Sequence, residues 1–359
     1  MKTIRVAILG LGRSGRDIHG RFLQIVPDMY KIAVAVDPLK ERRERAEKEY
    51  QCETYADYRE ILNRKDLDII INATPSHLHV PITLDLLHHG FHVLCEKPLA
   101  RKVEEVDQLI AASRKQGRIL AIFQQSRYAP YFRQVRKVID SGVLGRIVQI
   151  SIQFNGFSRR WDWQTLQEYN GGNLLNTGPH PLDQALQLFG TDIMPEITCI
   201  MDRANTFGDA EDYVKLILRG KDRPVIDLEI SSCCAYPCFT YNIQGVYGGL
   251  KGTMEHIQWK YYRPEEAAEQ KLQRQPLHNV DGTPAYCSEG LKWYEEAWEV
   301  PHGEKDLFMT MSGAFYSMLY RTLTEQAPLE ITPQQVRQQI AVIEECHRQN
   351  PLSPIELDL

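Results

Sequence analysis

A short apolar run that leads into closely spaced glycines is the feature that most constrains the fold. Residues 6–9 (VAIL) are followed by residues 10–15 (GLGRSG), and apolar residues at helical spacing continue to residue 25. A strand, a tight glycine turn and a helix in this order bring backbone amides to where they can approach a pyrophosphate. The pattern predicts a dinucleotide cradle, and the residues expected to contact the ligand are Gly10, Leu11, Gly12, Arg13 and Ser14.

An acidic residue closes the second apolar run. Residues 32–36 (IAVAV) end at Asp37, which predicts a second strand with a carboxylate at its tip. A carboxylate in this place accepts hydrogen bonds from the adenosine ribose hydroxyls and repels a 2′-phosphate. We therefore expect NAD as the cofactor in preference to NADP. The alternative, a glycine turn that binds no ligand, is disfavoured because Asp37 is present.

The length, charge and start of the chain indicate the class of protein. At 359 residues the chain is long for one core, and a guide of about 150 residues per domain suggests two domains. A formal net charge of −5 gives no electrostatic reason to expect nucleic acid or an anionic membrane as a partner. The first residues lead directly into a strand, and no apolar stretch reaches about 18 residues. We expect a cytoplasmic protein that acts on a small molecule.

The cysteines give one candidate metal site. The chain has 8 cysteines, too few and too scattered to suggest a disulfide framework. Only Cys233, Cys234 and Cys238 cluster. Adjacent residues of a strand point to opposite faces, and no fourth ligand lies at a typical spacing. We therefore expect buried thiols at these positions and no metal site.

The pattern of the first 125 residues is typical of a doubly wound α/β fold. Short apolar runs at residues 68–73, 92–95 and 119–123 alternate with helical segments such as residues 103–116. Nearly continuous apolar runs indicate strands that are buried on both faces. Their alternation with helices predicts βαβ units and a parallel sheet.

The pattern changes after Tyr128. Residues 147–154 and 225–231 alternate strictly between apolar and polar side chains, which predicts strands with one buried and one polar face. We expect an open, mainly antiparallel or mixed sheet that helices cover on one side. Further strands are predicted at residues 213–218, 239–246 and 250–259, and helices at residues 131–140, 307–324 and 333–348, with another that reaches Phe189. Residues 263–301 are long and irregular, which predicts a functional or poorly ordered loop.

Two groups of polar residues follow strands of the first half. Thr74, Pro75 and His79 come directly after a central strand, at the edge where ligands bind in open α/β sheets, and we expect them to contact the cofactor. Glu96 and Lys97 follow the next strand. A lysine that is partly desolvated under a bound cofactor has a lowered pKa and can exchange a proton with an alcohol. The alternative is a surface lysine held in a salt bridge.

A third group lies in residues 171–183 (GGNLLNTGPHPLD). The two prolines of this segment fit only the first turn of a helix, so Asn176 or Thr177 is the expected cap. His180 then projects from the opening turn, where it can act as a general acid or base. Asp183, one turn further on, is its expected orienting partner. The alternative is a capping histidine without a chemical role.

These motifs, in this order, resemble the glucose-fructose oxidoreductase / inositol dehydrogenase / rhizopine catabolism (Gfo/Idh/MocA) family. The resemblance covers nearly the whole chain and rests on the glycine turn with Asp37, Thr74-Pro75 through His79, Glu96-Lys97-Pro98, and Gly171-Gly172 through His180 and Asp183. It implies an N-terminal Rossmann domain, residues 1–125. It also implies a C-terminal α/β domain, residues 126–359, whose open sheet binds substrate and forms a homo-oligomer.

The resemblance further implies an activity and the residues that carry it. Members of the family mostly oxidise or reduce a ring carbon of a sugar or cyclitol. Lys97 and His180 would flank the reacting carbinol, and Glu96 would help to hold the cofactor. Residues 159–163 (RRWDW) resemble a family loop that closes over cofactor and substrate. The residues expected to contact the substrate there are Arg160 and Trp163, with Tyr128 as a further candidate.

One position departs from the family pattern. Many family dehydrogenases carry aspartate where this chain has Asn176, and an amide cannot take up a proton. Proton transfer then falls to Lys97 or His180, and Asn176 only hydrogen-bonds a substrate hydroxyl.

Three functions are compatible with the sequence. The leading one is an NAD-dependent dehydrogenase in which a hydride leaves a secondary carbon of a sugar, glycoside or cyclitol while Lys97 or His180 takes the hydroxyl proton. The second is a glycosidase or lyase in which the oxidation is transient and NAD stays tightly bound. The third is a non-catalytic sensor of NAD and a sugar, which Lys97 and His180 disfavour and Asn176 favours.

Overall fold

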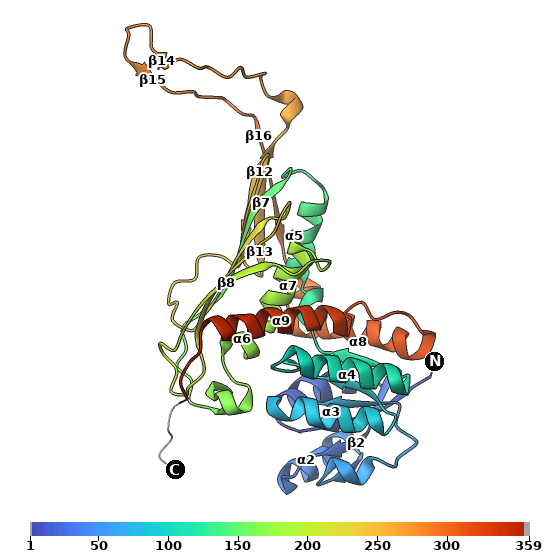
Figure 1. Cartoon of the computed structure of the whole chain (residues 1–359). Helices are drawn as coiled ribbons and strands as arrows, with labels where there is room; N and C mark the ends of the chain where they lie inside the picture. Colours follow the sequence, from blue (N-terminus) through green and yellow to red (C-terminus); the bar gives the residue numbers. More distant parts are fainter. Residues whose placement is uncertain (1, 355–359) are drawn as a thin grey trace.

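Two large β-sheets organise the chain, one built from residues 4–122 and the other from residues 147–299. The structure is a computed structural model that describes residues 2–354. Figure 1 shows the first sheet with its helices below the second sheet, and the C-terminal helices α8 (Leu307–Glu325) and α9 (Pro333–Gln349) across the junction.

The first sheet is the predicted parallel, doubly wound sheet. Its strand order is β3-β2-β1-β4-β5-β6, and every neighbouring pair is parallel. This is the order of dinucleotide-binding folds, in which a crevice forms where the order reverses, at the carboxyl ends of β1 and β4. The strands are β1 (Ile4–Leu9), β2 (Tyr30–Val36), β3 (Glu53–Tyr55), β4 (Ile69–Asn72), β5 (His92–Cys95) and β6 (Leu120–Ile122). The helices are the π-helix η1 (Arg13–Gly20), α1 (Arg21–Gln24), α2 (Lys40–Tyr50), α3 (His79–His88), α4 (Val103–Gln116) and the short 3-10 turns η2 (Tyr58–Ile61) and η3 (Ser76–Leu78).

These strands are apolar along their length because helices cover both faces of the sheet. Ile8, Ile70 and Val93 are fully buried. The strands end where the apolar run gives way to glycine or to polar residues, at Gly10 after β1 and at Glu96 after β5. Polar groups therefore gather at one edge of the sheet, as the sequence predicts.

The second sheet is mixed and open, also as predicted. Its order is β16-β13-β12-β11-β7-β10-β9-β8, with β7 and β10 parallel and the other neighbours antiparallel. Helices α5 (Pro130–Asp140) and α7 (Pro179–Phe189) pack on one face. The other face carries polar side chains such as Gln149 and Ser151, which remain half-buried. The strands are β7 (Ile147–Asn155), β8 (Glu196–Asp202), β9 (Tyr213–Arg219), β10 (Val225–Ser231), β11 (Tyr241–Gly245), β12 (Gly248–Gly252), β13 (His256–Tyr262) and β16 (Trp293–Glu299).

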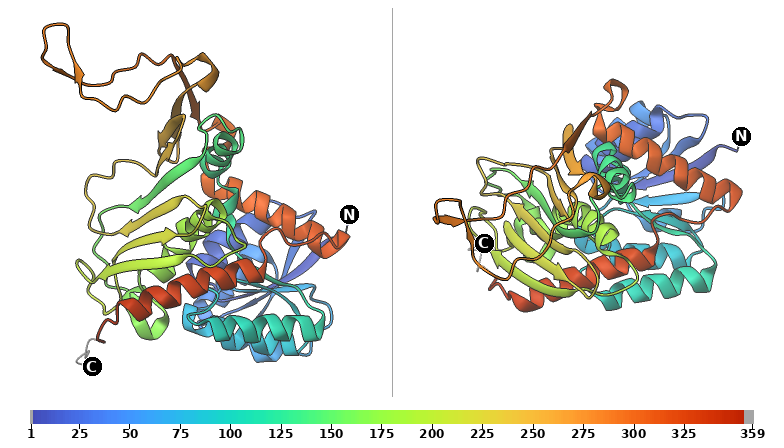
Figure 2. Two further views of the ribbon diagram at one scale, coloured as in Figure 1. Left: turned by 45° about the horizontal axis from the view of Figure 1, so that its top comes forward. Right: turned by 90° about the horizontal axis from the view of Figure 1, so that it is seen from above.

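Two predictions about the second half are wrong. Residues 250–259 are not one strand, because a turn between Thr253 and His256 separates β12 from β13. Residues 263–301 are not irregular throughout, since β16 lies within them and pairs with β13 as an edge strand. The remaining residues, 263–292, form an arm that projects from the sheet and ends in the small hairpin of β14 (Leu277–His278) and β15 (Pro284–Ala285), as Figures 1 and 2 show.

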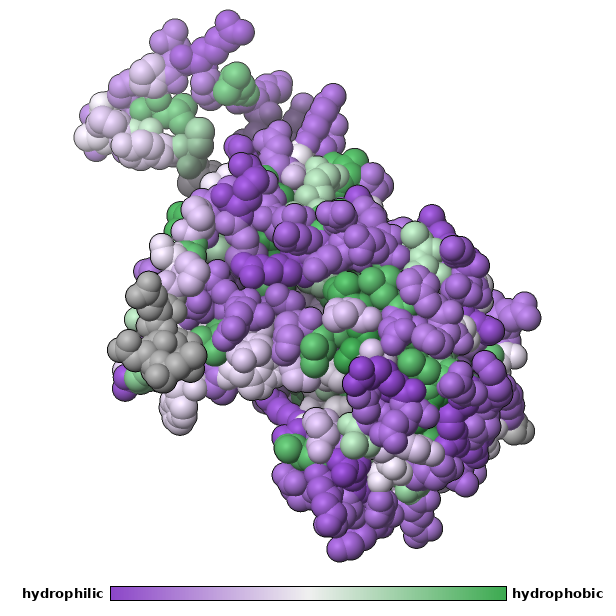
Figure 3. Space-filling view, turned by 60° about the horizontal axis from the view of Figure 1, so that its bottom comes forward, coloured by the Kyte–Doolittle hydropathy of each residue, from purple (hydrophilic) through white to green (hydrophobic). Residues whose placement is uncertain are grey.

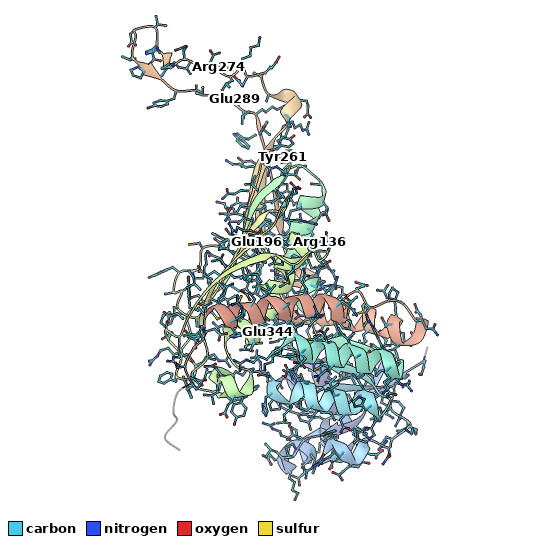
Figure 4. The ribbon with its side chains drawn as sticks, in the orientation of Figure 1. Arg136, Glu196, Tyr261, Arg274, Glu289 and Glu344 are labelled. Atoms are coloured by element: carbon cyan, nitrogen blue, oxygen red, sulfur yellow. The ribbon has the colours of Figure 1, made fainter. Side chains whose placement is uncertain are left out.

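The C-terminal helices fix the two sheets to each other. Tyr316 of α8 stacks on Phe22, with 5.1 Å between ring centroids, and lies edge-on to Tyr30 at 5.3 Å. Glu344 of α9, labelled in Figure 4, accepts a hydrogen bond from the backbone amide of Val103 at 2.9 Å. In Figure 2 the red helix α9 runs from the second sheet to the helices of the first. The carboxyl end of β5 is thereby held against the second half of the chain.

The cysteine cluster after β10 is partly exposed. Cys233 and Cys238 are exposed in the loop after β10, so the expectation of buried thiols is wrong for them. Across residues 2–354, no group of three or more histidine, cysteine, aspartate or glutamate side chains is arranged to hold a metal ion. In the same described range, no helix combines the length and the apolar character that crossing a membrane requires.

Candidate active site

The glycine turn after β1 has the shape that a dinucleotide requires. Gly10 has φ +83°, and a Cβ there would lie 2.6 Å from the carbonyl oxygen of Ala73. A Cβ at Gly15 would lie 1.7 Å from the carbonyl oxygen of Gly10. Only glycine therefore lets the turn lie against the loop after β4. The amides of the first turn of η1 lack intrahelical partners by geometry, so Gly12, Arg13 and Ser14 fit a pyrophosphate.

Asp37 lies at the tip of β2, but it is less accessible than the sequence suggests. Its Oδ2 accepts hydrogen bonds from the Leu11 amide at 2.8 Å and from Arg42 at 3.2 Å, and its Oδ1 accepts from the Leu39 amide at 2.9 Å. The side chain is only 2% exposed. Asp37 therefore anchors the glycine turn itself, and its charge stands at the end of the crevice.

The loop after β4 carries Thr74, Pro75 and His79, and the three differ in accessibility. Thr74 is half-buried, and its hydroxyl donates to Asn72 Oδ1 at 2.7 Å. His79 is 1% exposed, and its ring nitrogens lie 2.7 Å from the Pro98 carbonyl oxygen and 2.9 Å from the Thr74 carbonyl oxygen. Whichever ring nitrogen carries the hydrogen therefore donates to a carbonyl oxygen of the protein. His79 connects the two strand-end loops, and its contact with the cofactor stays a prediction.

Lys97 reaches from the end of β5 to the second half of the chain. Its Nζ donates to the backbone carbonyl oxygen of Asn176 at 2.7 Å. Burial lowers the pKa of the Lys97 ammonium, the charges of Arg13 and Arg160 lower it further, and the charge of Glu96 opposes them. Lys97 is therefore not a surface lysine held in a salt bridge.

His180 stands in the first turn of α7, on the same side of the junction. Its Nδ1 lies 3.1 Å from Ser126 Oγ. Burial lowers the pKa of the imidazole to about 3, and the charge of Lys97 lowers it as well, so the ring is neutral at neutral pH. The second ring nitrogen, Nε2, remains available for a substrate.

The expected partner of His180 is wrong. Asp183 is bound by Arg127, whose Nε and Nη2 donate to its two oxygens, and both side chains are almost fully buried. Arg127 binds this carboxylate because Asp183 lies on the inner face of α7, opposite the turn η4 (Gln125–Tyr128). The predicted cap is wrong too, since Gly178 occupies the N-cap position and Asn176 ends the separate short helix α6 (Asn173–Asn176).

Glu96 is enclosed by residues that sequence reasoning missed. Its Oε1 lies 3.1 Å from His19 Nε2, and its Oε2 accepts a hydrogen bond from the Lys97 amide at 3.1 Å. His19 Nδ1 lies 2.6 Å from the hydroxyl of Tyr316. Burial raises the pKa of Glu96, but the bond with His19 and the nearby charges outweigh it and bring the pKa to about 2. Glu96 is therefore a buried anion beside Lys97, and it leaves little surface for a cofactor.

The remaining candidates lie around the junction. Arg160 donates to Asp162 and Gln164 within its own loop, and its charge acts on Lys97. Trp163 is 40% exposed and stands edge-on to Tyr169, which in turn contacts His77 of the loop after β4. The Arg/Trp loop thus approaches the cofactor side.

The hydroxyl of Tyr128 is engaged outside this group. Its hydroxyl donates to Glu330 at 2.9 Å, in the connection between α8 and α9. Among the described contacts of Tyr128 there is none with Lys97, Asn176 or His180.

Both halves of the chain match known protein families. Residues 4–124 match the family model described as "Oxidoreductase family, NAD-binding Rossmann fold". Residues 132–251 match the "GFO/IDH/MocA C-terminal domain". The first half is thus an NAD-binding Rossmann fold, which agrees with the glycine turn and the strand order.

Similar proteins include several that act on carbohydrates or cyclitols by name. The 2,7-anhydro-N-acetylneuraminate hydratase of Mediterraneibacter gnavus is 29% identical over 262 residues, 70% of this chain and 67% of the relative. The scyllo-inositol 2-dehydrogenase (NADP(+)) of Bacillus subtilis is 30% identical over 219 residues, 60% of each chain. Among solved structures, the WlbA dehydrogenase from Bordetella pertussis in complex with NADH and UDP-GlcNAcA has a TM-score of 0.76 at 20% identity and covers 99% of both chains. That likeness shows the shared fold.

Proposed function

Because the chain belongs to the Gfo/Idh/MocA family of oxidoreductases, we propose that it is an NAD-dependent dehydrogenase of a secondary alcohol in a sugar, glycoside or cyclitol. The observation that carries the proposal is the place of Lys97. It follows a strand of the Rossmann sheet, yet its ammonium contacts Asn176, four residues before His180. This contact supports a site in which Lys97 from one part of the chain and His180 from the other act at the edge of the sheet where NAD binds.

Each residue has a distinct proposed role. NAD held by the glycine turn supplies the hydride acceptor. Lys97 in its neutral form takes the hydroxyl proton as the carbinol carbon loses its hydride, so that a carbonyl forms. Since the pKa of His180 is about 3, we assign it a hydrogen bond to the reacting oxygen and not the uptake of the proton. Asn176 orients a neighbouring hydroxyl, and Arg160 and Trp163 close the site.

We propose that NAD is preferred to NADP. The support is the charge of Asp37 at the end of the crevice, which opposes a 2′-phosphate. Arg42 lies 3.2 Å from this carboxylate and partly neutralises it, so the preference depends on the pair. Thr74 and Pro75 remain candidate cofactor contacts.

A second function, a lyase or glycosidase with transient oxidation, is favoured by one observation. The relative from M. gnavus carries the name of a hydratase, a class of enzyme that adds or removes water without net oxidation of its substrate. In such a reaction product appears without accumulation of reduced nicotinamide, and NAD survives purification.

A panel of sugars, glycosides and cyclitols separates these functions. The protein is incubated with NAD, and both the absorbance of reduced nicotinamide and the loss of substrate are recorded. A dehydrogenase reduces NAD in step with substrate loss, whereas a lyase consumes substrate alone. If no member of the panel is consumed, the proposed function is wrong.

We also propose that residues 126–359 bind substrate and mediate a homo-oligomer, with residues 1–125 as the cofactor domain. Two surfaces support association. The polar face of the second sheet is uncovered, and the arm stands clear of the body in Figures 1 and 3. Leu272, Val280 and Tyr286 of the arm are at least 90% exposed, which is unusual for side chains of this size in a monomer.

The exposed thiols of Cys233 and Cys238 suit a reducing compartment such as the cytoplasm.

A further inference from the structure

A cavity of about 590 Å³ borders the proposed reaction site. It reaches Thr177, the residue after Asn176, and is lined by the ends of β7 and β10 and by two loops, residues 237–240 and 253–255. Neither Lys97 nor His180 belongs to its wall. At about 30 Å³ for a water molecule, this volume equals roughly 20 waters and exceeds the needs of one sugar ring. We call this cavity the outer pocket.

The wall of the outer pocket is rich in hydroxyl and amide groups between apolar side chains. Its apolar members include Phe157, Phe239 and Met254. It holds one carboxylate, Glu255, and the part of the chain that the structure describes contributes no lysine or arginine to it. The polar members that matter here are Asn155, Asn173, Thr177, Ser232, Thr240 and Thr253. A wall of this composition suits a hydroxylated ring, which presents polar edges and apolar faces.

The hydrogen bonds within the wall leave both donors and acceptors for a ligand. Asn173 Nδ2 donates to the Asp212 carbonyl oxygen at 2.7 Å and to Ser232 Oγ at 2.9 Å, so its carbonyl oxygen remains as an acceptor. Asn155 Nδ2 donates to Glu229 Oε1 at 2.6 Å, which uses one of its two N–H groups. The hydroxyl groups of Thr177, Thr240 and Thr253 can each donate and accept. A ligand hydroxyl, which also does both, is complementary to such a wall.

We propose that the outer pocket binds a second, uncharged sugar unit of the substrate and discriminates against a substrate whose second unit carries a carboxylate. This inference rests on the proposed function and names its substrate class, a neutral glycoside of more than one ring. Ligand hydroxyl groups pair with the hydroxyl and amide groups of the wall. A carboxylate meets no lysine or arginine in the described wall and stands near the carboxylate of Glu255, so no counter-ion compensates its desolvation.

The test compares three substrates with the same reacting ring. They are a methyl glycoside, a neutral disaccharide, and the same disaccharide with a uronic acid as its second unit. We expect kcat/KM for the neutral disaccharide to be about 10-fold or more above the value for the methyl glycoside. For the acidic disaccharide, kcat/KM should be about 10-fold or more below the value for the neutral disaccharide. Affinities of the same sugars for the Lys97→Met variant, measured by calorimetry, give a second readout without turnover, and the same order is expected.

A charge reversal in the wall checks the cause. Glu255→Lys should lower the ratio of kcat/KM for the neutral disaccharide to that for the acidic disaccharide about 10-fold. Glu325→Lys, the same change at an exposed position of α8, should leave this ratio unchanged. The inference is overturned if kcat/KM is equal for the acidic and neutral disaccharides, or if the second ring does not raise kcat/KM above that of the methyl glycoside. In either case, oxidation of the methyl glycoside still upholds the proposed function. If the methyl glycoside and the disaccharides are all inert, the proposed function fails and this inference with it.

Discussion

The Nζ of Lys97 lies 2.7 Å from the backbone carbonyl oxygen of Asn176, a bond that joins the Rossmann sheet to the short helix α6, between β7 and β8 of the second sheet. The bond keeps a lysine amine at the edge where the cofactor binds. Its acceptor is a backbone atom, so the side chain that replaces the family's usual aspartate is not needed to hold Lys97. The asparagine at position 176 therefore leaves the geometry of the lysine intact and removes only a second titratable group.

The pH dependence of turnover should respond to the charges around Lys97. The proposed role of Lys97 requires a neutral amine, so kcat should rise with pH through the pKa of Lys97, which lies below the usual lysine value. Glu96 raises this pKa and Arg160 lowers it. Glu96→Gln should move the rising limb to lower pH, and Arg160→Gln should move it to higher pH. Arg159→Gln, a neighbour that lies over the ring of Phe207, serves as the control. Rising limbs at the same pH in the kcat profiles of all three variants would contradict the role of Lys97 as the proton acceptor.

The chain of contacts from Tyr316 through His19 to Glu96 predicts a loss of stability. Tyr316→Phe leaves Nδ1 of a fully buried His19 without its partner, which costs about 1–3 kcal/mol of unfolding free energy. Tyr320→Phe is the matched control, because its hydroxyl bonds only to the Lys2 carbonyl oxygen at a partly exposed place. The free energy of unfolding of the two variants is measured with denaturant. Equal losses of unfolding free energy would contradict a special contribution of the hydrogen bonds from Tyr316 through His19 to Glu96.

Glu96 also predicts how stability depends on acid. Its pKa is about 2 in the folded protein and 4.5 by its ordinary value. A depressed pKa contributes stability that is fully present above pH 4.5 and is lost as the pH falls through about 2. The difference in unfolding free energy between the wild type and Glu96→Gln should therefore shrink over this window. A difference that stays constant from pH 5 to pH 2 would show that the carboxylate is not held as an anion.

The sequence predicts the parts of this site that depend on local order along the chain. The glycine turn, the Glu96-Lys97 pair at a strand end and the first turn around His180 each follow from neighbouring residues. The pairings of Arg127 with Asp183 and of His19 with Tyr316 join elements that are far apart in the chain, and no local pattern contains them. Such contacts are decided by which helices pack together.

The turn between β12 and β13 was open to prediction from one detail. Leu250 and Ile257 are both apolar and both buried, although they lie seven positions apart, an odd offset. In a single strand they would point to opposite faces of the sheet. An interruption between them is therefore required when only one face is covered.

Asp37 predicts the choice of cofactor. Asp37→Asn keeps an oxygen for the Leu11 amide, removes the charge and leaves Arg42 free to meet a 2′-phosphate. The ratio of kcat/KM with NADP to that with NAD should rise about 10-fold or more, since a change of about 1.4 kcal/mol is tenfold. Glu41→Gln, on the exposed side of α2, controls for the loss of one acid. An unchanged ratio would mean that Asp37 only anchors the glycine turn.

The arm predicts the state of association. Tyr262 and Trp293 are directly paired across β13 and β16, so a two-residue Asn-Gly turn can replace residues 263–292. The shortened chain should keep its secondary structure by circular dichroism and show a smaller assembly by light scattering. If the shortened chain forms an assembly of the same size as the full chain, association depends on the sheet face alone. If the full chain is a monomer, the proposed oligomer is wrong.

The proposed role of Lys97 is tested most sharply by the rate of nicotinamide reduction in a single turnover, with enzyme in excess over a sugar that the panel identifies. Wild type and Lys97→Met are compared, and the affinity of each for NAD is measured beforehand. We expect equal NAD binding and a loss of about 10²-fold to 10⁴-fold in the rate for Lys97→Met, the range typical of a lost general base. A variant that reduces NAD at the wild-type rate would show that Lys97 is not the general base.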